Sequence, residues 1–156
     1  MDFTKAQILE RRFLRLAQLI HDHWAEGSGM NTDLFKEPLI HDSFVIRAVS
    51  IAPGATYSEH VVPRVFLRDQ CMLMYSNGAP VEAVTGILTR YLWIAKITPE
   101  EADRIDHQFG YKTTMPPGWV LGRDDALARL REAGIDLQPS PGAVFPIEWH
   151  DTKAAQ

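Results

Sequence analysis

Six histidines and one cysteine are the residues best suited to chemistry in this chain of 156 residues. The most informative stretch is residues 58–63, where Glu59 precedes His60 at the end of a predicted strand and two valines and a proline follow. Cys71 is the single cysteine, so it can form no disulfide within the chain and no cysteine-rich zinc site. It falls on an apolar helical face, which favours a buried structural thiol. The Glu59–His60 pair is therefore the leading candidate for a functional site.

The stretch of residues 58–63 resembles the opening motif of the His-Me finger, or HNH, nucleases. The resemblance implies a phosphodiesterase that uses one divalent metal ion, Mg²⁺ or Mn²⁺. Neighbouring residues of a strand point to opposite faces. The resemblance therefore implies that His60 faces the scissile phosphate and deprotonates a water molecule, while Glu59 reaches the metal, which stabilises the leaving oxygen. It covers residues 57–109.

The second metal ligand of this family, a histidine or asparagine, lies on a helix that follows a second strand. In this chain residues 92–97 would be that strand, and Asp106 or His107 is the nearest match for the ligand. Asp103 lies one turn before His107, and residues three to four apart share a helix face, so these two could converge on one ion. The resemblance therefore implies a metal held by Glu59 together with Asp106 or His107.

Phosphate binding is assigned to Arg64 or Arg68, which follow the motif closely in the sequence. Two features depart from the family pattern. Roughly thirty residues that carry two predicted helices separate His60 from the next strand, whereas a compact finger needs fewer. No asparagine or histidine stands at the usual middle position of a short loop. A catalytically degenerate relative is therefore the alternative to an active nuclease.

The histidines also have structural interpretations. His60 could be an exposed strand residue or a hydrogen-bonded core histidine, and His107 could lie on a helix surface. His21 and His23 are two residues apart on the first helix, so they face different directions and do not predict a joint metal site. His60 is the histidine with a recognisable motif around it.

Apolar periodicity and helix-capping residues predict five helices and three strands. The strongest helix start is residues 98–101, where an N-cap threonine, a proline at the first position and an acid at the third follow one another. The first helix carries an apolar stripe along one side. The predicted helices are residues 4–25, 65–75, 81–92, 99–109 and 124–133, and the predicted strands are residues 43–50, 57–62 and 92–97.

These elements predict an α+β fold in a single domain, residues 1–156, with a small antiparallel sheet of three strands surrounded by about five helices. Residues 1–28 would form a long amphipathic N-terminal helix, residues 43–134 the core and residues 135–156 an extended tail. The N-terminal helix would pack either on the core or on a second copy of itself, which would give a homodimer.

The composition is that of an ordinary folded protein, with 46% hydrophobic and 23% charged residues. No run of about 18 apolar residues occurs, so we expect no membrane span and no membrane partner. The N-terminus lacks the pattern of a secretory signal and cysteine is scarce, so we expect a cytoplasmic protein. The net charge of -4 disfavours broad binding to nucleic acid, but residues 60–96 hold four Lys and Arg against two acids. A local nucleic-acid site therefore stays open.

A non-enzymatic function also fits the sequence: a cytoplasmic inhibitor or adaptor that binds a protein partner, for instance one encoded by a mobile element against a host system. The loop of residues 111–119 would supply an exposed apolar patch for such a partner. The patch would consist of Met115, Pro116, Pro117 and Trp119.

A third function is a DNA-binding regulator of the helix-turn-helix kind. Two predicted helices flank Asn77 and Gly78, and residues 81–92 would be the recognition helix. That helix has fewer basic and amide side chains than recognition helices usually carry, so simple packing of a helical hairpin explains the pattern as well.

Overall fold

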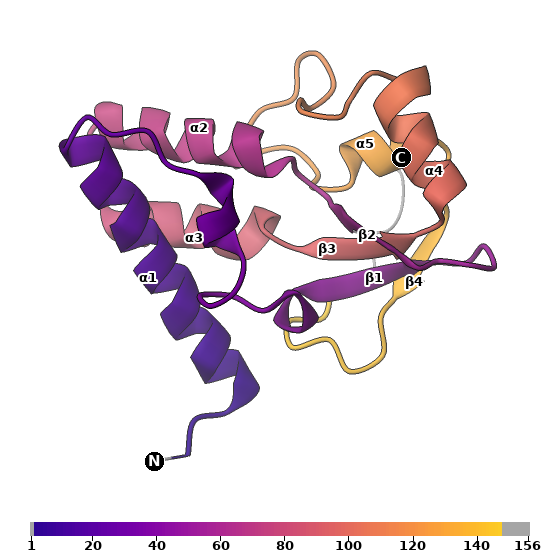
Figure 1. The fold of residues 1–156 in the computed structure, drawn as a ribbon, viewed down its shortest axis with the longest axis horizontal. Coiled ribbons are helices and arrows are strands. Elements are labelled where there is room, and N and C mark those ends of the chain that lie inside the picture. Colours follow the sequence, from indigo (N-terminus) through magenta and orange to yellow (C-terminus); the bar gives the residue numbers. More distant parts are fainter. Residues whose placement is uncertain (1, 148–156) are drawn as a thin grey trace.

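The structure, a computed structural model, describes residues 2–147, and within them a mixed sheet of four strands lies beside a layer of helices (Figure 1). The strands are β1 (Ile46–Ser50), β2 (Tyr57–His60), β3 (Ile94–Ile97) and β4 (Leu137–Pro139). Their order is β2-β3-β1-β4. β3 pairs parallel with β1 and antiparallel with β2, and β4 pairs antiparallel with β1.

The predicted α+β class is confirmed, but the sheet differs from the predicted one in two ways. It is mixed rather than antiparallel, because the chain leaves β2 through two helices and returns between the two earlier strands, where β3 pairs with both. It also contains β4, within the segment predicted as an extended tail. β4 is short and lies at the sheet edge, where the missing N–H of Pro139 does not interrupt a ladder.

Five α-helices occur in the described residues, close to the predicted positions. They are α1 (Lys5–Ala25), α2 (Arg64–Ser76), α3 (Val81–Tyr91), α4 (Pro99–Asp103) and α5 (Ala128–Glu132), and the short 3₁₀ turns η1 (Thr32–Phe35) and η2 (Asp42–Phe44) lie between α1 and β1. None of these helices combines the length and the apolar character that a membrane crossing requires.

The helix predicted for residues 99–109 changes its geometry part-way. After α4 the chain continues as the π-helical turn η3 (Arg104–Gln108), where the Phe109 N–H donates to the carbonyl of Arg104 at 3.0 Å. A hydrogen bond over five residues widens the turn and rotates the side chains that follow. Residues of this segment therefore face directions that a regular α-helix would not give them.

The long helix α1 packs against α2 and α3 of the same chain (Figure 1). Its start is fixed by a capping box, in which the Gln7 N–H donates to Thr4 Oγ1 at 3.1 Å and the Thr4 N–H donates to Gln7 Oε1 at 2.9 Å. Its buried side chains are Leu9, Phe13, Leu16, Ala17 and Ile20. Packing within the chain accounts for the apolar stripe, and the homodimer through this helix stays a prediction.

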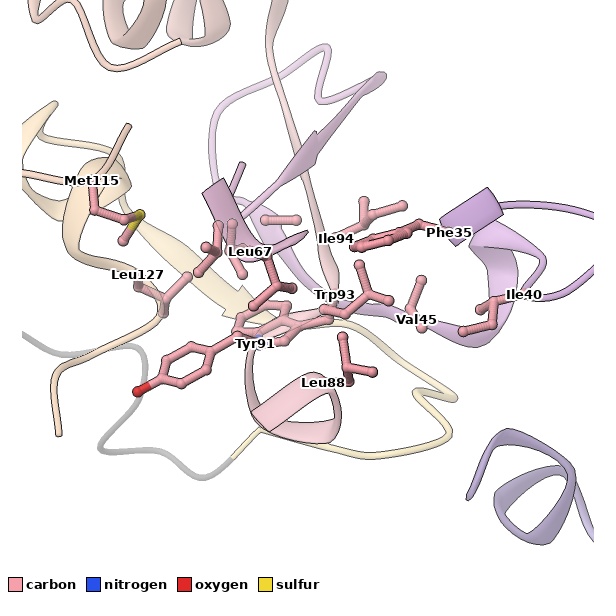
Figure 2. Close-up of a cluster of buried hydrophobic side chains, with 14 of the residues drawn as sticks. Phe35, Ile40, Val45, Leu67, Leu88, Tyr91, Trp93, Ile94, Met115 and Leu127 are labelled. Atoms are coloured by element: carbon pink, nitrogen blue, oxygen red, sulfur yellow. The ribbon is translucent and has the colours of Figure 1, made fainter. Parts of the chain in front are cut away.

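Trp93, in the link between α3 and β3, belongs to the buried cluster that joins the helices to the sheet (Figure 2). Its side chain is buried, and its indole N–H donates to the carbonyl of Arg90 at 3.1 Å. The Arg47 guanidinium lies over the Trp93 ring at 5.5 Å and over the Phe145 ring at 5.6 Å. Phe145 thereby attaches the chain beyond β4 to the core. The end of the predicted tail, residues 148–156, lies outside the described residues.

Hydrogen bonds at the start of α4 fix this helix directly after β3 in the chain. The predicted capping box is present: the Glu101 N–H donates to Thr98 Oγ1 at 3.0 Å and the Thr98 N–H donates to Glu101 Oε1 at 2.9 Å. The Ser50 hydroxyl donates to Glu101 Oε2 at 3.0 Å. The buried carboxylate therefore caps the helix and also ties it to the end of β1, and α4 contacts β2.

Cys71 is fully buried on α2, as predicted. Burial raises the pKa of its thiol to about 12, so the reactive thiolate is scarce at neutral pH. We expect an aromatic disulfide reagent to modify the folded protein at the rate at which it unfolds, and the denatured protein at once. Absorbance of the released thiolate measures both rates, and fast modification that is independent of added urea would contradict the expectation.

Candidate functional site

The end of β2 opens into a pocket of about 530 Å³, a size typical of small-molecule sites. Its walls come from η1 and the turn after it, η2, β2, the start of α2, η3, the loop after η3, and α5. The charged side chains that line it are Lys36, Asp42, Glu59, Arg64, Asp106, Lys112 and Arg129. The fold thus gathers charges from distant parts of the sequence around the predicted Glu59–His60 site.

Glu59 and Arg129 form a buried ion pair in the wall of this pocket. Arg129 Nη2 donates to Glu59 Oε1 at 3.0 Å, and the two side chains are only 1% and 11% exposed. The same guanidinium donates to the backbone carbonyl of His60, to that of Val61 at 3.2 Å and to that of Tyr111 at 2.6 Å. Arg129 therefore closes the outer side of β2, which has no neighbouring strand in the described residues, and holds the loop after η3 against it.

Burial and neighbouring charges act in opposite directions on this pair. Burial raises the pKa of the Glu59 carboxyl, Arg129 opposes that shift, and Asp106 adds to it. Burial lowers the pKa of Arg129, and Glu59 opposes that shift. A guanidinium stays protonated in proteins, so Arg129 supplies a fixed positive charge beside Glu59. Asp106 lies within electrostatic range of both.

His60 is neutral at physiological pH. Burial and the nearby charges of Arg64, Lys36 and Arg129 lower its pKa to about 3. A neutral imidazole can accept a proton, as a general base must, but so low a pKa makes the unliganded group a weak base. An anion bound among these cations would remove part of the repulsion and raise the pKa of His60.

Lys36, Arg64 and Lys112 are the cations of the pocket that the buried pair does not use. Arg64 Nη1 makes one long hydrogen bond, at 3.4 Å, to the carbonyl of Thr32 and lies 4.0 Å from Asp33. Within residues 2–147 neither Lys36 nor Lys112 has an ion-pair partner. Because the three cations come from three separate segments, a bound anion would be held from several sides.

The structure brings four of the six predicted site residues to the pocket and leaves two outside. Those that line it are Glu59, His60, Arg64 and Asp106. His107 Nδ1 lies 2.7 Å from Asp103 Oδ1, and both side chains are exposed. Arg68 donates to the carbonyl of Met30 at 2.9 Å and pairs with Asp69 at 2.9 Å. Asp103 and His107 do converge, but on each other and away from Glu59, and Arg68 connects α2 to the segment before η1.

The divalent metal implied by the resemblance does not fit these residues. The Glu59 carboxylate is bound to Arg129, whose positive charge would repel a second cation at the same oxygens. His107 is hydrogen-bonded at the surface instead of facing the pocket. Among residues 2–147 no group of three or more histidine, cysteine, aspartate or glutamate side chains is arranged to hold a metal ion.

Arg129, Lys36 and Lys112 are the pocket residues that the sequence did not single out. Arg129 lies 70 positions after Glu59, on a helix whose neighbouring arginine, Arg131, makes it look like part of a solvated face. Lys36 and Lys112 both lie outside residues 60–96, the segment of local positive charge. No motif joins these positions, so only the fold could bring them together.

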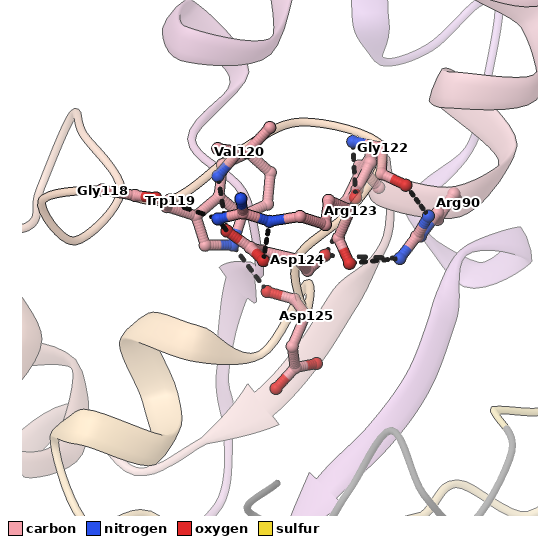
Figure 3. Close-up of polar contacts among 9 residues, drawn as sticks. Arg90, Gly118, Trp119, Val120, Gly122, Arg123, Asp124 and Asp125 are labelled. Atoms are coloured by element: carbon pink, nitrogen blue, oxygen red, sulfur yellow. Dashed lines mark hydrogen bonds and ion pairs between the residues drawn. The ribbon is translucent and has the colours of Figure 1, made fainter.

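Three polar side chains of α3, those of Thr85, Thr89 and Arg90, form hydrogen bonds within the chain, which gives no support to a recognition helix. The Thr85 hydroxyl donates to the carbonyl of Val81 at 2.8 Å, and that of Thr89 donates to the carbonyl of Thr85 at 2.8 Å. Arg90 donates to the carbonyls of the turn formed by residues 122–124 (Figure 3). The helix-turn-helix function stays a prediction.

The predicted apolar patch of the loop of residues 111–119 is wrong in its main members. Met115 is 4% exposed and Pro116 is buried. The Trp119 indole N–H donates to the carbonyl of Asp125 at 2.8 Å (Figure 3), and its ring packs on Tyr91 at 5.2 Å between centroids. The core takes up these side chains, so a protein partner stays a prediction without this surface.

No protein-family model matches the chain, and comparisons with curated proteins and with solved structures give no match either. The functional assignment therefore rests on the residues, contacts and charges of the pocket.

Proposed function

We propose that the protein is a catalytically degenerate relative of the His-Me finger nucleases, which binds a nucleic-acid phosphate in the pocket at the end of β2. The observation that carries the proposal is that Lys36, Arg64 and Lys112 line one pocket together with neutral His60, and that Arg129 already neutralises Glu59 there. Cations held in a concave site are the feature that phosphate recognition needs.

The order of the elements also supports this proposal. β2 and β3 pair antiparallel, and α4 with η3 follows β3, which is the succession of two strands and a helix that the resemblance implies. Asp106 of η3 lines the same pocket as Glu59 and His60. The helices α2 and α3 fill the interval between the strands, and the start of α2 contributes Arg64 to the pocket.

Fluorescence anisotropy with labelled single-stranded and duplex DNA tests the proposal. The double variant Arg64→Ala/Lys112→Ala should bind about tenfold more weakly or worse, because a charge-assisted hydrogen bond contributes about 1.5–3 kcal/mol. The slope of log affinity against log salt should become shallower by about one for each lost phosphate contact.

The matched control is Lys5→Ala/Arg15→Ala, which removes the same charge from exposed positions of α1. It should bind DNA nearly as the wild type does. Equal losses in the two double variants, or no binding by the wild type at low salt, would contradict the proposal. If the wild type nicks plasmid DNA with Mg²⁺ or Mn²⁺ and His60→Ala does not, the protein is an active nuclease and not a degenerate relative.

A further inference from the structure

Arg129 has the environment that a bound cation would need in this pocket. Its side chain is fully buried and its guanidinium contacts Glu59, the carboxylate that the resemblance assigns to a metal. A buried carboxylate requires a positive partner or loses its charge, and here the partner is part of the chain.

The bonds of Arg129 resemble those of a structural ion more than those of a ligand-binding arginine. A guanidinium has five N–H donors, and four hydrogen bonds are made: to the carboxylate of Glu59 and to the carbonyls of His60, Val61 and Tyr111. Little donor capacity is left for an anion. The side chain instead fixes the end of β2 and the segment that leads into Lys112.

Three separate parts of the pocket thus depend on one buried charge. Glu59 is held in the wall, the backbone at His60 is fixed where its imidazole meets the pocket, and Tyr111 brings the neighbouring Lys112 to the rim. A metal ion in a nuclease orients a carboxylate and a substrate phosphate by the same means, fixed positive charge and directed bonds.

We infer that Arg129 replaces the divalent cation of this pocket, so that the protein positions its ligand without a metal and excludes a metal from Glu59. The inference rests on the proposed function only for the identity of the ligand. Exclusion of the metal follows from the Arg129–Glu59 pair alone, and it is measurable without any nucleic acid.

Titration with Mn²⁺, followed by the electron paramagnetic resonance signal of the free ion, tests the exclusion. The wild type should show no site that depends on Glu59. Arg129→Met should gain one Mn²⁺ site that binds about tenfold more tightly, or better, than any Mn²⁺ binding by the wild type. The repelling charge of Arg129 is lost, and the carboxylates of Glu59 and Asp106 remain. Arg129→Met/Glu59→Gln should lose that site, and Arg123→Met, which breaks an exposed arginine–carboxylate pair, should gain none.

A wild-type Mn²⁺ site that Glu59→Gln or Asp106→Asn abolishes would overturn the inference, and this arm needs no variant of Arg129. A folded Arg129→Met protein, verified by circular dichroism, that gains no Mn²⁺ site would overturn it too. DNA binding by the wild type should need no metal, so removal of divalent ions with EDTA should not weaken it. If the wild type binds no DNA but Arg129→Met gains the Mn²⁺ site, the proposed function is refuted and the inferred role of Arg129 is supported.

Discussion

Replacing Arg129 by methionine is expected to lower the free energy of unfolding by about 3–5 kcal/mol, because it leaves the Glu59 carboxylate buried without its partner. The loss also removes the hydrogen bonds to the carbonyls of Val61 and Tyr111. Urea denaturation followed by circular dichroism and tryptophan fluorescence measures the change. Removing only the charge, in Glu59→Gln, should cost less, because the amide oxygen can still accept from Arg129.

Arg123→Met is the matched control for this prediction. Arg123 Nε lies 2.8 Å from Asp124 Oδ1 (Figure 3), but the Arg123 side chain is 66% exposed. Solvent screens an exposed ion pair, so such a pair contributes little to stability and the control should be nearly neutral. If Arg129→Met and Arg123→Met lower the free energy of unfolding equally, the buried Glu59–Arg129 pair contributes no more to stability than an exposed pair does. In the double variant Arg129→Met/Glu59→Gln part of the lost stability should return, since no unpaired charge stays buried.

The local features of the fold were predictable because they depend on neighbouring residues. The capping box of Thr98 and Glu101 needs only a threonine and an acid three positions apart, and the structure contains it. The apolar face of α1 and the buried thiol of Cys71 follow from helical periodicity in the same way. The strand order does not follow from local patterns, because β3 pairs with both β1 and β2, which lie far from it in the sequence.

The sequence predicted some residues of the candidate site and missed others. Glu59 and His60 are adjacent, so a short motif finds them, and Asp106 was one of two predicted helix positions. Asp106 of the π-helical turn η3 lines the pocket, while the neighbouring His107 pairs with Asp103 at the surface. The sequence alone left the choice between these two adjacent positions open.

Arg129 shows why the rest was not predictable. An arginine in a short helix is usually a surface residue, and nothing near it in the sequence indicates that it is 1% exposed. Its function appears only when β2, the loop after η3 and α5 meet, since Arg129 lies on α5 and its hydrogen bonds reach the end of β2 and that loop. The position of Arg129 also changes the interpretation of Glu59. The resemblance implied a metal ligand, and in the structure Glu59 is the ion-pair partner of Arg129.

Lowering the pH from 7 to 5 should destabilise the wild type by about 2 kcal/mol more than it destabilises His60→Gln. The pKa of His60 is about 3 in the folded state, against an ordinary value near 6.5. Between these values the unfolded chain binds a proton that the folded chain does not bind, so this contribution to stability is present above pH 6.5 and is lost as the pH falls. The reason is that a charged imidazole would be buried beside Arg64, Lys36 and Arg129.

Urea denaturation of both proteins at the two pH values measures this difference, in buffers without phosphate or sulfate. His107→Gln is the control for replacing a histidine that is exposed and lies outside the pocket. Other titrating groups are common to all three proteins and cancel in the comparison. Added sulfate, which does not titrate in this range, should reduce the difference if it binds among the cations, because its charge would favour protonated His60. Identical pH dependence in the wild type and His60→Gln would show that burial and these charges do not hold His60 neutral, and this support for the phosphate pocket would be lost.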